Sequence, residues 1–185
     1  MYHISNDKRS YQSVQLIIQA LLRDLNQHPL QEITIRALCE NAGVGRVTFY
    51  RHFDSIDDVL RKHCDDTFDQ LKNYLQKFYE EHSKHEPFLK PFLQFWYQDS
   101  QILEILIRYN KQDMIREALM RMIQSTKRRP EKSEALNAYH VAVQIAVAIA
   151  ILSKWIEHGK NVSVDVLTQS ILKTLKEPVN IIFEN

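Results

Sequence analysis

Residues 46–51 carry side chains with the chemistry to bind nucleic acid. Those side chains are Arg46, Val47, Thr48, Tyr50 and Arg51. Arginine, threonine and tyrosine donate hydrogen bonds to phosphate oxygens, arginine also pairs with guanine edges, and a small apolar side chain contacts the thymine methyl group. On a helix, Phe49 and Phe53 would share one face, and the polar side chains would lie on the opposite face and the flank. The spacing therefore predicts a short helix with one core face and one face available for DNA.

A second helix and a glycine turn must hold that segment in place. Thr34 is a suitable N-cap for a helix over residues 34–41. The apolar residues that recur at helical spacing in it are Ile35, Leu38 and Ala42. Gly43 can end this helix in a left-handed conformation without a Cβ penalty, and the next helix begins near Gly45. Two short helices joined by such a turn form a helix-turn-helix.

Apolar periodicity predicts helices through most of the remaining chain. Only three glycines and five prolines occur among the 185 residues, and few segments alternate as strands do. We therefore expect an all-α protein. Besides the helix-turn-helix, the expected helices cover residues 8–27, 55–81, 102–109, 114–123, 135–155 and 164–175, with a loop at 127–130.

A boundary near residue 54 divides the predicted helices into two domains. Residues 1–54 hold the helix-turn-helix and the helix before it, and residues 55–185 form a larger helical domain. The formal net charge is only +1, but residues 1–53 carry six basic and four acidic side chains, whereas residues 54–69 carry two basic and six acidic ones. The basic excess therefore lies in the domain that we expect to contact DNA.

The other reactive side chains do not form a catalytic or metal pattern. Residues 63–66 read His-Cys-Asp-Asp, and adjacent residues on a helix point in different directions, so they cannot all reach one ion. The sequence also lacks a glycine-rich phosphate loop and paired carboxylates in an apolar setting. We expect no metal, no cofactor and no catalytic residues. An enzyme is the less favoured alternative, which turnover assays would detect.

Composition predicts a cytoplasmic protein without a membrane partner. Cys39 and Cys64 lie in helical patterns, which suits reduced thiols better than a disulfide framework. Residues 1–8 lack the apolar stretch of a signal peptide. The most apolar run, residues 141–152, is shorter than the roughly 20 residues that span a bilayer. We expect it to be a buried helix, one side of which a partner subunit could cover.

The chain resembles the TetR family of bacterial transcription regulators. The resemblance rests on residues 33–39 (Ile-Thr-Ile-Arg-Ala-Leu-Cys), 42–45 (Ala-Gly-Val-Gly) and above all 48–53 (Thr-Phe-Tyr-Arg-His-Phe). It is specific over residues 8–70 and architectural beyond them. Residues 155–172 additionally look like the C-terminal helix pair of a branch common in Firmicutes, related to regulators of dihydroxyacetone utilisation.

The resemblance implies roles for individual residues of the helix-turn-helix. At the matching positions of the family, Thr34 and Tyr50 would bind phosphate and His52 would support the backbone contact. The residues that would face DNA are Arg36, Arg46, Val47, Thr48 and Arg51. One position departs from the family, because many members have lysine where this chain has Ile56. The family's C-terminal domain binds a small ligand and dimerises through its last two long helices.

These observations favour a ligand-responsive regulator that binds a palindromic operator as a homodimer, with repression as the expected mode. A small-molecule effector would occupy the second domain. The aromatic and methionine residues that either line its pocket or form ordinary core are Phe92, Trp96, Tyr109 and Met114. The alternative is a TetR-like protein that acts through protein contacts without operator binding, and a salt-dependent DNA-binding assay distinguishes the two.

Overall fold

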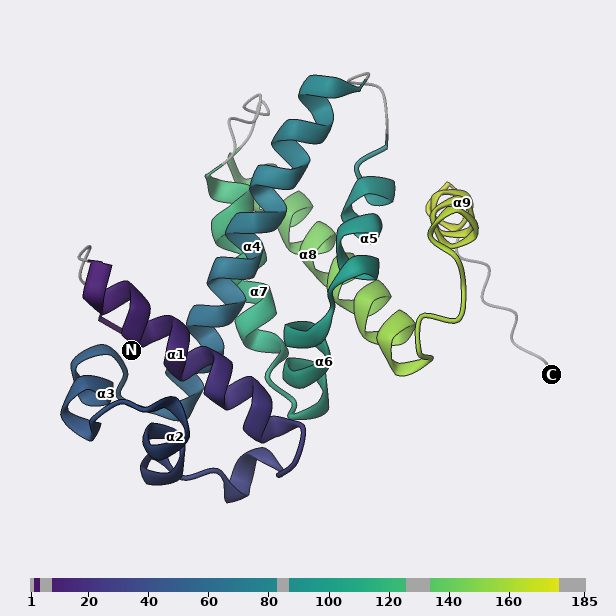
Figure 1. Cartoon of the computed structure of the whole chain (residues 1–185). Helices are drawn as coiled ribbons and strands as arrows, with labels where there is room; N and C mark the ends of the chain where they lie inside the picture. The colour runs from purple at the N-terminus through teal and green to yellow at the C-terminus, as the bar shows by residue number, and fades with distance from the viewer. Residues whose placement is uncertain (1, 4–7, 83–86, 126–133, 177–185) are drawn as a thin grey trace.

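The computed structural model describes residues 2–3, 8–82, 87–125 and 134–176. Its regular elements are helical, which confirms the all-α prediction (Figure 1). The elements are α1 Lys8–Leu25, the 3₁₀ turn η1 Leu30–Glu32, α2 Ile35–Ala42, α3 Arg46–His52, α4 Ile56–Glu81, α5 Leu89–Gln98, α6 Gln101–Arg108, α7 Gln112–Gln124, α8 Glu134–Glu157 and α9 Val164–Thr174. The loop expected at residues 127–130 lies outside the described residues.

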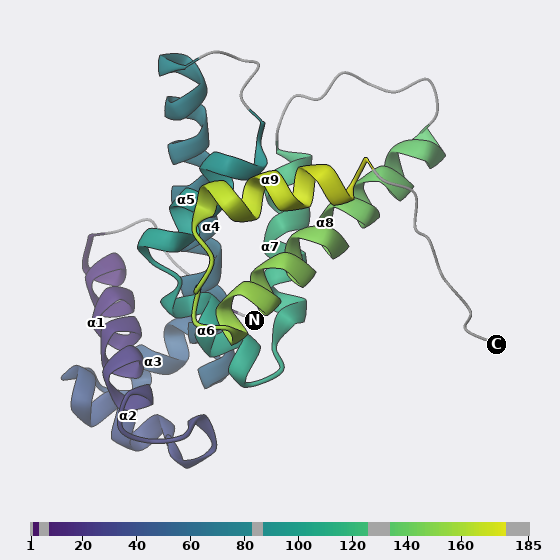
Figure 2. The same ribbon diagram turned by 90° about the vertical axis from the view of Figure 1, so that its right-hand side faces the viewer.

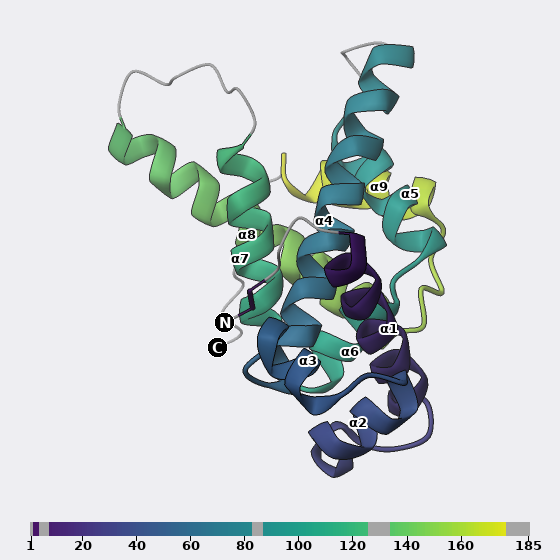
Figure 3. The same cartoon turned by 60° about the vertical axis from the view of Figure 1, so that its left-hand side comes forward.

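Helices α1, α2 and α3 gather at one end of the molecule, as Figure 3 shows. The side of α1 that carries Val14, Ile17 and Leu21 is buried, and α2 and α3 pack against this helix. Leu38 of α2 and Phe49 of α3 are fully buried in the same core. The N-terminal three-helix unit expected from the sequence is therefore present.

Helix α4 begins at the end of this unit and runs through the larger part of the molecule (Figure 1). Its first turn is fixed by a capping box: Ser55 Oγ accepts from the Asp58 N–H at 3.2 Å, and Asp58 Oδ2 accepts from the Ser55 N–H at 3.1 Å. Further along, α4 packs against α5, α6 and α7. One long helix thus joins the helix-turn-helix to the second set of helices.

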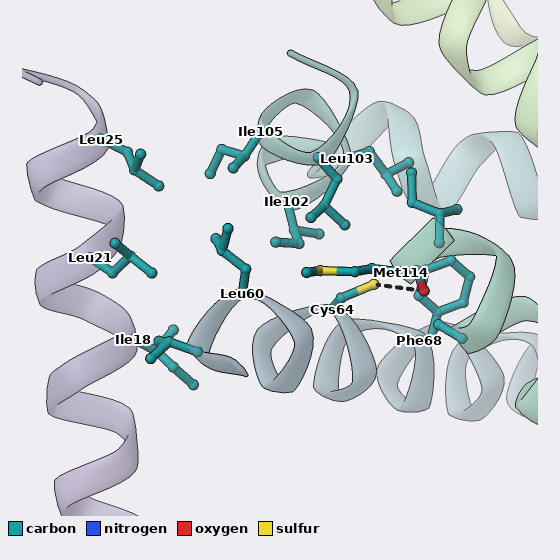
Figure 4. Close-up of a cluster of buried hydrophobic side chains, with 14 of the residues drawn as sticks. Ile18, Leu21, Leu25, Leu60, Cys64, Phe68, Ile102, Leu103, Ile105 and Met114 are labelled. Atoms are coloured by element: carbon teal, nitrogen blue, oxygen red, sulfur yellow. Dashed lines mark hydrogen bonds between the residues drawn. The ribbon is translucent and has the colours of Figure 1, made fainter. Parts of the chain in front are cut away.

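The hydrophobic core is continuous across the expected domain boundary. In Figure 4, Ile18 and Leu21 of α1 point toward Leu60 of α4, and Ile102 and Ile105 of α6 approach from the other side. All five side chains are buried in a single cluster. The boundary near residue 54 therefore marks a change of element along the chain and does not coincide with a gap in the packing.

Helix α8 corrects the expectation of a buried helix. Among the α8 side chains that the structure describes, only Ile145, Leu152 and Trp155 are buried within one chain, whereas Tyr139 and Val143 are exposed. Residues Leu136–Glu157 are also long and apolar enough to cross a membrane by length and composition, a test that core helices of soluble proteins pass as well. The apolar run expected at residues 141–152 is shorter than this stretch, because it ends at the flanking polar side chains. Helix α9 packs against α5, and in the view of Figure 2 it passes in front of α8.

Candidate nucleic-acid interface

Local hydrogen bonds cap both ends of α2. Thr34 caps α2, because its Oγ1 accepts from the Ala37 N–H at 3.2 Å. At the other end Gly43 adopts a left-handed conformation with φ of 66°, and the Val44 N–H donates to the carbonyl of Cys39 at 3.0 Å. A side chain at position 43 would be strained by this φ value. The turn therefore depends on glycine at position 43.

Helix α3 has the two faces that its sequence predicts. Phe49 has no exposed surface and packs beside Phe53, with ring centroids 5.7 Å apart. On the other side Val47 is 76% exposed and Tyr50 is 56% exposed. The arginines of the helix, Arg46 and Arg51, are exposed as well, and Thr48 is half-buried. The structure thus brings five of the predicted DNA-contact side chains onto one accessible surface.

Two further predicted contacts, Thr34 and Arg36, lie at the N-terminal end of α2. Thr34 is exposed, and since its oxygen accepts the capping bond, its hydroxyl proton is available to a phosphate. Arg36 is exposed and pairs through Nε with Glu40 Oε1 at 3.0 Å. An exposed ion pair of this kind contributes little to stability. Arg36 can therefore exchange its carboxylate partner for a phosphate.

The structure does not place His52 on this surface, which corrects its assignment as a DNA-contact residue. Its side chain is only 2% exposed, and Nδ1 lies 3.2 Å from the carbonyl oxygen of His3. The His52 carbonyl in turn accepts from the His3 N–H at 2.8 Å. His52 therefore faces the N-terminal segment, and any support it gives to DNA binding acts through the position of α3.

Ile56 occupies the position at which many TetR family members have lysine. It is the first residue of α4, it is half-buried, and it packs against the hydrophobic core. The neighbouring Asp54 and Asp57 are exposed. Asp57 pairs with Lys111 Nζ at 2.6 Å. Ile56 itself therefore contributes packing, and the cation at the start of α4 comes from Lys111, which precedes α7.

A cavity of about 760 Å³ lies among α4, α5, α7, α8 and α9. Its wall is mainly apolar, with Leu75, Leu119, Met122 and Ile145 among the lining residues. The volume lies within the range of small-molecule sites. The cavity lies in the larger helical domain, in which the aromatic and methionine residues could form either a ligand pocket or ordinary core.

Of the four residues predicted to bind a ligand, only Phe92 lines this cavity. Trp96 and Met114 are buried core residues outside its wall, and Trp96 packs against Phe68 with ring centroids 5.2 Å apart. Tyr109 ends α6, where its hydroxyl accepts a hydrogen bond from the Leu30 N–H at 3.1 Å. Its role is thus to join two parts of the chain.

One cationic side chain, Lys72 of α4, lines the cavity. It is half-buried, and in the described part of the chain no ion pair engages it. Glu80, two turns further along α4, also lines the cavity but is exposed. The cavity therefore has one partly desolvated positive group in an otherwise mainly apolar wall.

Both cysteines are buried and reduced. Burial raises the pKa of the Cys64 thiol to about 12, and burial likewise raises the pKa of Cys39. Because the thiolate is the reactive species, raised values make both thiols slow to oxidise. The structure thus favours packing over redox sensing for both residues.

Comparisons with known proteins agree with the geometry of the helix-turn-helix. Residues 17–62 match the family described as bacterial regulatory proteins, tetR family. No curated protein matches the chain. A crystal structure of Lin0861 from Listeria innocua is similar in fold, with a TM-score of 0.74, 16% sequence identity and 94% of each chain covered. Residues 17–62 of this chain are therefore similar to the N-terminal domain of the TetR family of bacterial regulatory proteins.

Proposed function

We propose that this protein is a DNA-binding transcriptional regulator that places α3 in the major groove of an operator. The observation that carries the proposal is the exposed surface of α3 with Arg46, Val47, Tyr50 and Arg51, held from behind by the buried Phe49. Arginine and tyrosine suit phosphate and base contacts, and a helix of this kind fits the groove. The TetR match over residues 17–62 supports the same assignment.

The active form that we propose is a homodimer built through α8 and α9. On α8, Ala142, Ala146 and Ala150 are exposed at intervals of four residues, which permits close approach of a second helix. Large apolar side chains are exposed on the same two helices, including Tyr139, Val143 and Val166. Covering them removes apolar surface from water. Two helix-turn-helix units would then bind half-sites about one DNA turn, or a multiple of about 34 Å, apart.

The cavity is the proposed site of a small, largely apolar effector. Apolar side chains make up most of its wall, and the half-buried Lys72 suits a ligand with at most one anionic group. Binding would shift the population between forms that can and cannot bind the operator, since the cavity is bounded by α4, which also leads into the helix-turn-helix.

Repression in the cytoplasm is the mode of action that we propose. Residues 155–172 support a second proposal, that the protein is related to the Firmicutes regulators of dihydroxyacetone utilisation. In that branch, activation of transcription is the alternative to repression. A protein that acts only through protein contacts is the competing function. It predicts no salt-dependent DNA affinity.

The deciding experiment selects bound fragments from the source genome and measures the affinity of the best fragment at several salt concentrations. We expect log affinity to fall linearly with log salt, because cationic side chains displace counterions from phosphates. A random duplex of equal length serves as the control and should bind at least a thousandfold more weakly. Equal affinity for the two duplexes would contradict the operator-binding proposal.

A further inference from the structure

Two residues before α1 hold the C-terminal end of the proposed recognition helix. Tyr2 and His3, here called the N-terminal strap, lie antiparallel to the chain at Phe53. The His3 N–H donates to the His52 carbonyl at 2.8 Å, and the His3 carbonyl lies 3.2 Å from His52 Nδ1. Because His52 is the last residue of α3, the strap fixes that end of the helix from two sides.

The other side of the strap is attached to α4. The Tyr2 hydroxyl donates to Asp65 Oδ2 at 2.6 Å, and Lys62 Nζ lies 6.0 Å from the centre of the Tyr2 ring. Burial and the hydrogen bond to Asp65 raise the pKa of Tyr2 well above its usual value. The hydroxyl therefore stays protonated and acts as the donor throughout the physiological range.

The second oxygen of Asp65 connects this contact to α7. Asp65 Oδ1 pairs with Arg121, and the Asp65 side chain is largely buried. Arg121 is flanked along α7 by Leu119, Met122 and Ile123, all of which line the cavity. A ligand that packs against those side chains must therefore contact the same turn of α7 that carries Arg121.

We propose that Tyr2 and Asp65 are positioning residues that link α7, beside the cavity, to the end of α3. In one state Asp65 bridges Tyr2 and Arg121, so the strap holds His52 and Phe53. When α7 moves, Asp65 loses the Arg121 partner that holds its carboxylate in position against Tyr2, the strap releases, and the end of α3 becomes free to change its position. The inference rests on the proposed function, because it assigns this movement to control of operator binding.

The test compares hydrogen exchange in the full-length protein and two variants. Tyr2→Phe removes the hydroxyl and keeps the ring, and Arg121→Gln removes the α7 partner without touching α3. Arg116→Gln is the matched control, because Arg116 lies on the same helix and pairs with Asp113 of α7. We expect amides at residues 51–54 to exchange about fivefold faster in both test variants, as one hydrogen bond is lost. Exchange in Arg121→Gln equal to that of the control would overturn the link.

A second measurement tests whether the strap matters for DNA. The affinities of wild-type protein and Tyr2→Phe are compared for the selected genomic fragment and for a random duplex at one salt concentration. We expect the ratio of the two affinities to fall about fivefold, because a displaced α3 loses base contacts while phosphate contacts persist. An unchanged ratio would overturn the positioning role. If the wild-type protein binds neither duplex, the proposed function fails, and the exchange result alone decides the link between α7 and α3.

Discussion

The hydroxyl of Tyr109 accepts a hydrogen bond from the backbone N–H of Leu30 at 3.1 Å. Tyr109 ends α6, and Leu30 begins η1, the turn between α1 and α2. This bond joins the larger helical part of the chain directly to the segment that precedes the helix-turn-helix. It also explains why a residue that composition suggested for ligand binding lies outside the cavity.

Tyr109→Phe is expected to lower the free energy of unfolding by about 1 kcal/mol, because it leaves the partly buried Leu30 N–H without its partner. Urea unfolding followed by circular dichroism measures the change. The variant should keep its affinity for apolar ligands, since Tyr109 does not line the cavity. Loss of ligand binding with unchanged stability would instead indicate that Tyr109 contacts the ligand.

Arg51→Ala and Tyr50→Phe are expected to weaken binding to the selected operator without unfolding the protein. Both side chains are exposed on α3, and Tyr50→Phe keeps the ring that packs edge-on against Phe49, so the core remains intact. Loss of one base contact costs roughly 1 to 3 kcal/mol of binding free energy. Operator affinity at fixed salt is measured beside a thermal melt. Wild-type affinity in both variants would show that α3 is not part of the DNA interface.

Ala146→Glu is expected to produce a monomer at micromolar concentration. Ala146 is exposed on α8 in a single chain, so glutamate is tolerated there, but in a dimer the carboxylate would be buried without a partner. Sedimentation velocity distinguishes the two states. The control is Lys77→Glu, at an exposed position of α4 outside the proposed interface that pairs with Glu81. A wild-type protein that sediments as a monomer would contradict the dimer.

Decanoate is expected to stabilise the free protein more than decanol, because both fill an apolar cavity but only the carboxylate pairs with Lys72. At a hundredfold excess over its Kd, decanoate should raise the melting temperature by about 5 °C or more. Lys72→Met should abolish the difference between the two ligands. Lys77→Met is the control, since Lys77 is exposed, lies outside the cavity wall and pairs with Glu81. Stabilisation by neither compound would argue against an apolar effector.

Features set by neighbouring residues were predictable from the sequence. The cap at Thr34, the turn at Gly43 and the buried face of Phe49 depend on side chains within four residues of one another, and periodicity identifies them. The same holds for the capping box of α4, in which Ser55 and Asp58 are three residues apart. These elements explain why the helix-turn-helix and its exposed surface were located correctly.

The side chains whose surroundings were predicted wrongly are those with partners distant in sequence. His52 meets His3, 49 residues away, and Tyr109 meets Leu30, 79 residues away. Helical periodicity gives the face on which a side chain lies but does not identify the element that covers that face. Phe92 and Trp96 illustrate the limit, because they lie four residues apart on α5 and only Phe92 lines the cavity.

The shared core in Figure 4 means that the helix-turn-helix is not a thermodynamically separate unit. A fragment cut at residue 54 would expose Ile18, Leu21 and Leu25 to water, and burial of each such side chain contributes about 1.5 to 3 kcal/mol. We therefore expect the helix-turn-helix and the helices around the cavity to unfold in one cooperative transition, in which a ligand bound in the cavity, far from α1, would protect α1 from melting as well.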